Sequence, residues 1–255
     1  MCESNRIKEV IVVDNYSQDK TIEIVKKSKN TILISNKVNL GFAKGTNVGI
    51  KKSKGDKILV LNPDTVISTG SIGKLLNCQT RLNADIVGGK LLKNNGSIHN
   101  SFVRKPDLLT GIFDFTNLRK IIPFDFFHKQ HYYLHEKYPN KGIEVDAVSG
   151  AYMLVNREVF ESIGLFDENF FMYLEDIDFC VRAKQSGLKV VFCPKSVILH
   201  EGGASSNNAD KINHKAWSDS RKYYFSKHFS KVENMVIQKV FILDDNLTVL
   251  WRKIR

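Results

Sequence analysis

The chain has 255 residues, 42% of them hydrophobic, and a formal net charge of +11. This is the composition of an ordinary soluble globular protein, and the length suits one large α/β domain or two small ones that need no disulfide or metal for stability. No zinc finger, basic zipper or aromatic RNA-binding motif is present, so nucleic acid is not an expected partner. The positive charge is consistent either with lysine-rich codon bias or with a membrane or phosphorylated partner.

The cysteines and the N-terminus indicate a reducing compartment. Cys2, Cys78, Cys180 and Cys193 lack the paired spacing of a metal site, so we expect free thiols. The N-terminus has no hydrophobic signal core, and no apolar run reaches the roughly 18 residues of a membrane span. We therefore predict a cytoplasmic protein.

The first part of the chain alternates short apolar runs with helical patterns. The expected strands and helices are, in turn, Glu9–Val13, Thr21–Lys29, Thr31–Ser35, Asn39–Gly55, Lys57–Leu61, Ser71–Leu82 and a strand opening at Ile86–Val87. This alternation predicts an α/β fold with a mainly parallel sheet flanked by helices. Ligands bind beyond the carboxyl ends of such strands, which is where Asp14 and Asp64 lie.

The second part is less regular at first. Residues 94–144 are aromatic and basic with weak periodicity, and we expect helices and loops over the site. Regular elements are then expected over Ala151–Val155, Arg157–Ile163, Glu175–Ser186 and Lys189–Cys193, with Val197–Leu199 continuing the last strand. We assign residues 1–229 to one domain and residues 230–255 to a helical or frayed tail.

Two acidic strand ends are candidate ligand sites. Asp14, followed by Asn15, could accept the imide N–H of a uracil or thymine ring, but the same residues also suit an Asx turn and a helix cap. Asp64, in Asn62-Pro63-Asp64, suits a divalent cation that bridges a diphosphate, or simply a turn.

Later motifs carry similar alternatives. Glu175, Asp176 and Asp178 open a helix after an aromatic run; one of them could be a general base, or all could favour the helix dipole. His200 ends an apolar strand and could bind a metal, although a lone histidine more often does not. The glycine-rich residues 41–49 allow close backbone approach, but their spacing excludes the dinucleotide-binding and P-loop motifs.

Together these motifs form an ordered series. VDNYSQD (13–19), NLGFAKGTNVG (39–49), LNPDT (61–65), the segment 148–187 and ILHEGG (198–203) resemble family 2 of the glycosyltransferases, in particular its bacterial rhamnosyltransferase-like branch. The resemblance covers residues 7–229. It implies the GT-A fold and inverting transfer of a hexosyl or rhamnosyl group from a nucleotide-diphosphate sugar to a glycan or lipid-linked acceptor of a surface polysaccharide. It also implies a divalent cation, Mg²⁺ or Mn²⁺.

The resemblance assigns roles to individual residues. Asp176 is the implied general base with Glu175 beside it, and Asp64 and His200 are the implied metal ligands. The implied nucleotide-sugar contacts are Asp14, Asn15, Asn39, Gly41, Asn47, Asp64, Ser149 and Gly150.

Two departures from the family pattern leave alternatives open. Asn62 stands where many relatives have a second aspartate. Relatives also usually begin with an apolar strand and a helix before the VDN segment, whereas here residues 1–4 resemble only the end of that helix. We therefore expect a GT-A fold without its first strand. An inactive or partner-dependent fragment that binds nucleotide without turnover is therefore a second hypothesis. A nucleotidyltransferase is disfavoured because its glycine- and arginine-rich loop is absent.

A basic segment near the end of the domain suggests a location. Residues 211–231 combine lysines with the aromatic side chains of Trp217, Tyr223, Tyr224 and Phe225. Such residues suit the surface of an anionic membrane, where a lipid-linked acceptor would be found. We predict peripheral contact with the inner face of the cell membrane.

Overall fold

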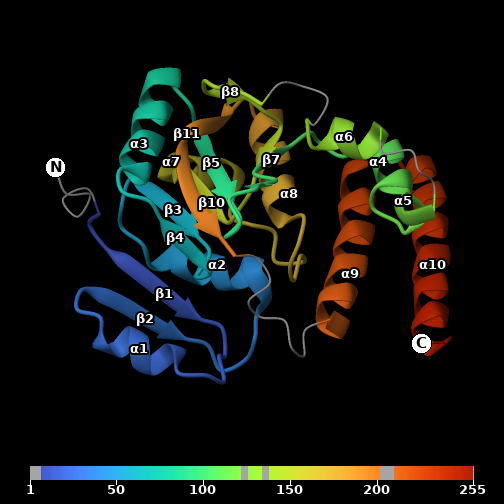
Figure 1. The fold of residues 1–255 in the computed structure, drawn as a ribbon, viewed down its shortest axis with the longest axis horizontal. Helices are drawn as coiled ribbons and strands as arrows, with labels where there is room; N and C mark the ends of the chain where they lie inside the picture. Colours follow the sequence, from blue (N-terminus) through green and yellow to red (C-terminus); the bar gives the residue numbers. More distant parts are fainter. Residues whose placement is uncertain (1–6, 122–125, 134–137, 202–209, 255) are drawn as a thin grey trace.

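The structure is a computed structural model that describes residues 7–121, 126–133, 138–201 and 210–254. A mixed sheet occupies the centre of the molecule (Figure 1). Its main path runs through β3 (Lys57–Leu61), β10 (Tyr152–Asn156), β5 (Ile86–Leu92), β11 (Val190–His200) and β4 (Thr65–Ile67). Two short strands extend it, β6 (Ile98–His99) beside β5 and β8 (Ile143–Glu144) beside β11.

The strand directions differ in part from the expected parallel arrangement. β5 and β11 run parallel, with a register shift between Cys193 and Val197. β10 runs antiparallel to both of its neighbours, and β4 runs antiparallel to β11. The mainly parallel order therefore does not extend to this sheet, although the α/β class and the flanking helices are confirmed.

The N-terminal part forms a smaller unit below the main sheet in Figure 1. It contains β1 (Val10–Asp14), α1 (Thr21–Lys27), β2 (Thr31–Ser35) and α2 (Gly41–Lys52). β1 and β2 run parallel, in register from Val10 opposite Thr31 to Asp14 opposite Ser35. In the described part of the chain, this pair is a sheet of its own and is not hydrogen-bonded to the main sheet.

Helices cover both faces of the main sheet. These are α3 (Ser71–Leu82), α7 (Arg157–Ile163) and α8 (Glu175–Gln185). Successive side chains of a strand point to opposite faces, so Met153 of β10 packs in one core with Phe179 of α8, whereas Leu154 packs in the other with Leu75 of α3. The two cores fix the sheet between its helical layers.

The segment of residues 94–144, which precedes β10, contains short strands and short helices among its described residues. After β7 (Phe102–Val103) come α4 (Leu108–Phe113), α5 (Leu118–Ile121) and α6 (Phe126–His131), and β9 (Ala147–Val148) returns the chain to pair with β7. Cys78, Cys180 and Cys193 are buried free thiols, as expected; Cys2 lies outside the described residues.

The C-terminal helices α9 (Asp210–His228) and α10 (Lys231–Ile254) pack side by side at the right of Figure 1. Their contact contains a buried arginine, Arg221, whose guanidinium lies 2.8 Å from Asp244 Oδ2 and also pairs with Asp245. Tyr224 and Phe225 of α9 are buried in the main core. Among the described residues, no helix combines the length and apolar character needed to cross a bilayer.

Candidate active site

Asp64 and His200 meet at one end of the main sheet. β4 pairs with the end of β11 so that Thr65 lies opposite His200, which brings the preceding residue, Asp64, against the imidazole. His200 Nε2 lies 3.2 Å from Asp64 Oδ1 and 3.3 Å from Asn62 Nδ2. Residues far apart in the sequence thus form one cluster through strand pairing.

His99 completes this cluster from β6. Its Nδ1 atom lies 3.3 Å from Nδ1 of His200, and the two rings are stacked. Burial and the neighbouring His200 lower the pKa of His99, which favours a neutral ring. His99 was not predicted as a site residue, because its segment contains no motif. His99 reaches the cluster only through the pairing of β6 with β5.

The donor atoms of this cluster fit a divalent cation. A carboxylate, an imidazole and an amide oxygen are all ligands that such ions accept. The Oδ1 atom of Asn62 is buried without a hydrogen-bond partner among the described residues, so it is available as a further oxygen donor. Within the same residues, no group of three or more His, Cys, Asp or Glu side chains has the arrangement of a complete metal site, so a cation here would need oxygen atoms from a substrate or water.

Asp176 lies at the first turn of α8 and faces the loop before β10. Its Oδ2 atom accepts a hydrogen bond from Gly150 N at 2.9 Å, and its Oδ1 atom accepts one from Ile177 N at 2.8 Å. Burial raises the pKa of Asp176, and these two N–H groups offset part of the effect. A carboxylate with a raised pKa and fixed orientation is suited to take a proton near neutral pH.

Glu175 is buried beside Asp176. Burial, together with the adjacent Asp176, raises the pKa of Glu175 well above its ordinary value. Its Oε2 atom has no hydrogen-bond partner in the described part of the chain. The adjacent carboxyl groups differ: two backbone N–H groups stabilise the Asp176 carboxylate, whereas burial disfavours the charged form of Glu175.

The turn before α8 has an unusual backbone. Tyr173 and Leu174 both have left-handed φ angles, 76° and 68°. Left-handed residues other than glycine are uncommon, and two in succession are maintained only by surrounding contacts. Leu174 is buried in the core, which supplies such contacts and fixes where the first turn of α8 begins.

The loop at Ser149 and Gly150 joins the two halves of the site. A Cβ atom on Gly150 would lie 3.3 Å from Asp176 Cβ and 3.2 Å from the ring of Phe42, so a larger residue would press against both. The next carbonyl, Ala151 O, accepts a hydrogen bond from Asn62 N at 3.0 Å. Asp176 and the Asp64–His200 cluster are therefore held by one short stretch of backbone.

The N-terminal candidates lie at the carboxyl end of β1. Asp14 is buried, and its Oδ1 atom accepts a hydrogen bond from Ser17 N at 3.2 Å, as in the Asx turn expected as an alternative. Asn15 donates to Asn39 Oδ1 at 3.0 Å and to Gly41 O at 2.9 Å. Both asparagines therefore shape the loop that leads into α2.

Gly41 connects this loop to the segment that precedes Asp176. Its φ angle is +78°, and a Cβ atom here would lie only 2.2 Å from Phe171 O. The same carbonyl accepts a hydrogen bond from Phe42 N at 2.6 Å. Only glycine fits this position, which fixes the start of α2 against the segment that precedes Asp176.

Asn47 has a similar connecting role. Its buried amide donates to Phe166 O at 2.8 Å and accepts from Phe166 N at 3.1 Å. These contacts hold α2 against the chain between α7 and α8. Asn47 thereby determines the shape of the region, while its amide is occupied by protein partners.

Asp178 links helix α8 to helix α9 through ion pairs. It is fully buried, with Arg182 Nε at 2.9 Å, Lys227 Nζ at 2.8 Å and His228 Nε2 at 2.8 Å. Arg182 is one turn further along α8, and the other two partners come from α9. Burial opposes ionisation, but these three partners hold the pKa of Asp178 below its ordinary value.

Comparison with known proteins identifies relatives of this chain. The family model described as "Glycosyl transferase family 2" matches residues 3–164. The chain is 29% identical over 232 residues to an N-acetylglucosaminyl-diphospho-decaprenol L-rhamnosyltransferase of Mycobacterium tuberculosis, covering 85% of this chain and 73% of that one. It is also 29% identical over 222 residues to the dTDP-rhamnosyl transferase RfbF of Shigella flexneri, covering 84% and 67%.

A solved structure supports the fold. GalNAc-T7 with UDP, GalNAc and Mn²⁺ matches with a TM-score of 0.54 and 16% identity. The match covers 75% of this chain but only 37% of that chain. The fold, the order of the motifs and the matched family model lead to one conclusion: this chain belongs to glycosyl transferase family 2 and is a rhamnosyltransferase-like glycosyltransferase with the GT-A fold.

Proposed function

We propose that the chain is an inverting glycosyltransferase that moves a sugar, with L-rhamnose as the first candidate, from a nucleotide-diphosphate donor to a hydroxyl group of a lipid-linked glycan. The observation that carries the proposal is the placement of Asp176 and the Asp64–His200 cluster along one stretch of backbone, Ser149 to Ala151. The names of the two rhamnosyltransferase relatives support the choice of donor and acceptor.

The proposed reaction is a single displacement. Asp176 removes the proton of the acceptor hydroxyl as its oxygen forms a bond to the anomeric carbon of the donor. The bond from that carbon to the diphosphate oxygen breaks, and the electron pair leaves with the nucleoside diphosphate. Attack opposite to the leaving group inverts the anomeric centre, and the proton remains on Asp176.

The leaving diphosphate needs compensation for its charge. Asp64 and His200 would hold a divalent cation, Mg²⁺ or Mn²⁺, which when bound stabilises negative charge on the diphosphate. The matching structure of GalNAc-T7 contains both UDP and Mn²⁺, and this supports the metal-dependent part of the proposal. Gly41 and the asparagines at positions 15 and 39 shape the loop in which the nucleotide would lie.

The acceptor of such an enzyme is attached to a membrane, so we further propose peripheral contact with an anionic bilayer. Tyr224 and Phe225, which the sequence analysis placed at this interface, are buried and cannot reach lipid. Several exposed apolar side chains lie on α10, among them Val232, Val236 and Leu243. Their spacing places them on one face of the helix, and the net charge of +11 favours anionic lipid.

The proposed reaction is tested by direct assay. The purified chain is incubated with dTDP-L-rhamnose, or with UDP-glucose and UDP-N-acetylglucosamine as alternatives. Each mixture contains Mn²⁺ and a synthetic alkyl diphosphate that carries N-acetylglucosamine. We expect a disaccharide product whose new linkage, determined by NMR, is inverted relative to the donor. Retention of configuration would refute the mechanism, whereas tight binding of the nucleoside diphosphate without turnover of any donor would favour the binding-only alternative.

A further inference from the structure

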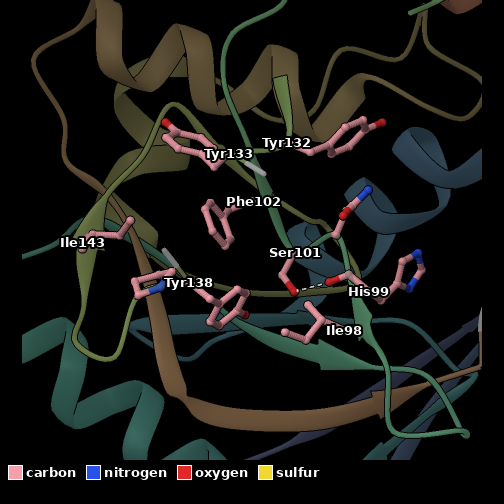
Figure 2. Close-up of a pocket in the computed structure, with 10 residues that line it drawn as sticks. Ile98, His99, Ser101, Phe102, Tyr132, Tyr133, Tyr138 and Ile143 are labelled. Atoms are coloured by element: carbon pink, nitrogen blue, oxygen red, sulfur yellow. Dashed lines mark hydrogen bonds between the residues drawn. The ribbon is translucent and has the colours of Figure 1, made fainter. Parts of the chain in front are cut away.

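An aromatic cavity lies beside the candidate active site. It has a volume of about 210 Å³, and its lining comes from β6, from β7 and from the chain on either side of residues 134–137 (Figure 2). Phe102 lies at its centre, with the ring of Tyr133 at 5.2 Å and that of Tyr138 at 6.1 Å between centroids. A water-sized group occupies roughly 10–15 Å³ by this kind of measure, so the cavity has room for a single hexose with its substituents.

One hydroxyl in this lining has no partner. The Oη atom of Tyr138 is buried and makes no hydrogen bond with any described residue. Burial raises the pKa of this phenol, so the group remains a protonated donor. A buried hydroxyl without a partner is unfavourable, and a ligand oxygen in the cavity would remove that cost.

The cavity adjoins both parts of the site. His99 forms one side of the cavity and is stacked on His200 of the Asp64–His200 cluster. Ser101, on the same side, accepts a hydrogen bond through its carbonyl from Ser149 N at 2.9 Å. The residue after Ser149 is Gly150, the partner of Asp176.

Tyr132 also lines the cavity. Its pKa is raised to about 12 by burial and by the carboxylates of Asp114 and Asp176.

We propose that this cavity is the acceptor pocket and that it holds the terminal pyranose ring of the acceptor. Aromatic walls suit the apolar C–H face of a sugar, and the Tyr138 hydroxyl donates a hydrogen bond to one of the polar substituents of the ring. The hydrogen bond from Ser149 N to Ser101 O joins this pocket to the backbone whose next residue, Gly150, donates to Asp176. This inference rests on the proposed glycosyl transfer, and it adds which residues recognise the acceptor.

The test compares two tyrosines whose buried hydroxyl groups each lack a hydrogen-bond partner among the described residues. Tyr138→Phe removes the hydroxyl from the cavity, whereas Tyr224→Phe removes a hydroxyl from the core between α8 and α9. Neither substitution breaks a hydrogen bond of the described protein, so both variants should fold. The probe is an undecyl diphosphate that carries N-acetylglucosamine, and binding is measured by calorimetry without donor.

We expect Tyr138→Phe to weaken probe binding about threefold to tenfold, the value of one ordinary hydrogen bond. Tyr132→Ala should weaken it further, and Tyr224→Phe should match the wild type. Binding of nucleoside diphosphate should be the same in all variants. Equal probe affinity in the wild type, Tyr138→Phe and Tyr132→Ala would overturn the proposal, and so would a wild type that does not bind the probe.

Two further outcomes separate this proposal from others. If undecyl diphosphate without a sugar binds equally well and is equally sensitive to Tyr138→Phe, the cavity holds the lipid chain and the assignment to a sugar is wrong. If the probe binds as expected but no nucleotide sugar is turned over, the pocket stands and the proposed catalytic function fails.

Discussion

The imidazole ring of His99 lies over that of His200, with centroids 5.2 Å apart and ring planes only 16° from parallel. Their Nδ1 atoms are 3.3 Å apart, so one of them donates a hydrogen bond and the other accepts it. If His200 binds a cation through Nε2, its proton must be on Nδ1, where His99 can accept it. In that case His99 would position the imidazole ring of His200.

This relationship predicts a graded effect on metal-dependent binding. Asp64→Ala and His200→Ala should abolish the increase in dTDP affinity that Mn²⁺ produces. His99→Ala should reduce manganese affinity by about 10–100-fold, the usual effect of losing a residue that orients a ligand. Calorimetry with dTDP, with and without Mn²⁺, measures both. If all three variants respond to Mn²⁺ like the wild type, the cluster is structural.

Asp176 and Asp178 should differ in what their loss affects. Asp176→Asn should lower the turnover rate by about 10²–10⁴-fold, because the general base is removed, with dTDP binding unchanged. Asp178→Asn should instead lower the melting temperature, because a buried carboxylate that pairs with Arg182 and two α9 side chains loses its charge. Steady-state kinetics and thermal unfolding distinguish the two effects. A fully active Asp176→Asn enzyme would remove this residue from the mechanism.

Gly41→Ala should disturb the nucleotide loop. The added methyl group would meet Phe171 O at 2.2 Å, and the φ angle of +78° is unfavourable for alanine. We expect a loss of stability of more than about 1 kcal/mol, together with weaker dTDP binding. Gly96→Ala is a suitable control, because its φ angle is also positive, +77°, but nothing lies within 4 Å of the added carbon. Equal melting temperatures for the two variants would show that contact with Phe171 is unimportant.

The attachment of α9 should depend on acid pH. Burial favours the protonated form of Asp167, but hydrogen bonds from Lys227, Asn169 and Tyr223 outweigh this and lower its pKa to about 2. Because the folded pKa lies below the unfolded value of about 3.9, the stabilisation is complete above that value and is lost as the pH falls toward 2. Asp167→Asn should therefore be less stable than the wild type at pH 7, and the difference should shrink below pH 4. A difference that does not change with pH would exclude ionisation as its cause.

The outer face of α10 should determine vesicle binding. The double variant Val236→Gln and Leu243→Gln should reduce sedimentation with phosphatidylglycerol vesicles by about tenfold, because apolar area that would enter the interface is lost. A matched control places glutamine at Ile24 and Val66, which are exposed apolar residues on other elements. Equal binding by both double variants would refute the membrane role. If the Val236→Gln and Leu243→Gln variant alone changes the oligomeric state, the outer face of α10 joins two copies of the chain instead.

The placement of several candidate site residues at strand ends could be predicted from the sequence. Short apolar runs precede Asp14, Asp64 and His200, each run forms a strand, and polar residues at strand ends collect at the edges of a sheet. Strand direction could not be predicted in the same way. An apolar run shows that a strand is buried, but β10 returns antiparallel to β5 only after the excursion of residues 94–144.

Residues in irregular or unusual environments were the ones missed. His99 belongs to a strand of two residues that forms only against β5. Arg221 belongs to the segment 211–231, which was expected to lie at an anionic membrane surface, yet Asp244 and Asp245 of the next helix allow Arg221 to be buried. Neither partner can be identified from local sequence, because each depends on a contact made by a separate element.

The left-handed pair at Tyr173 and Leu174 has a consequence for engineering this protein. Each such residue costs roughly 1–2 kcal/mol relative to an ordinary helical conformation, so the native state contains conformational strain directly before Asp176. Selection for thermal tolerance alone would favour substitutions that relax this turn, and the first turn of α8 would then be free to move away from Gly150. Thermostable descendants obtained in that way would be slower enzymes, so screens for stability should count turnover as well.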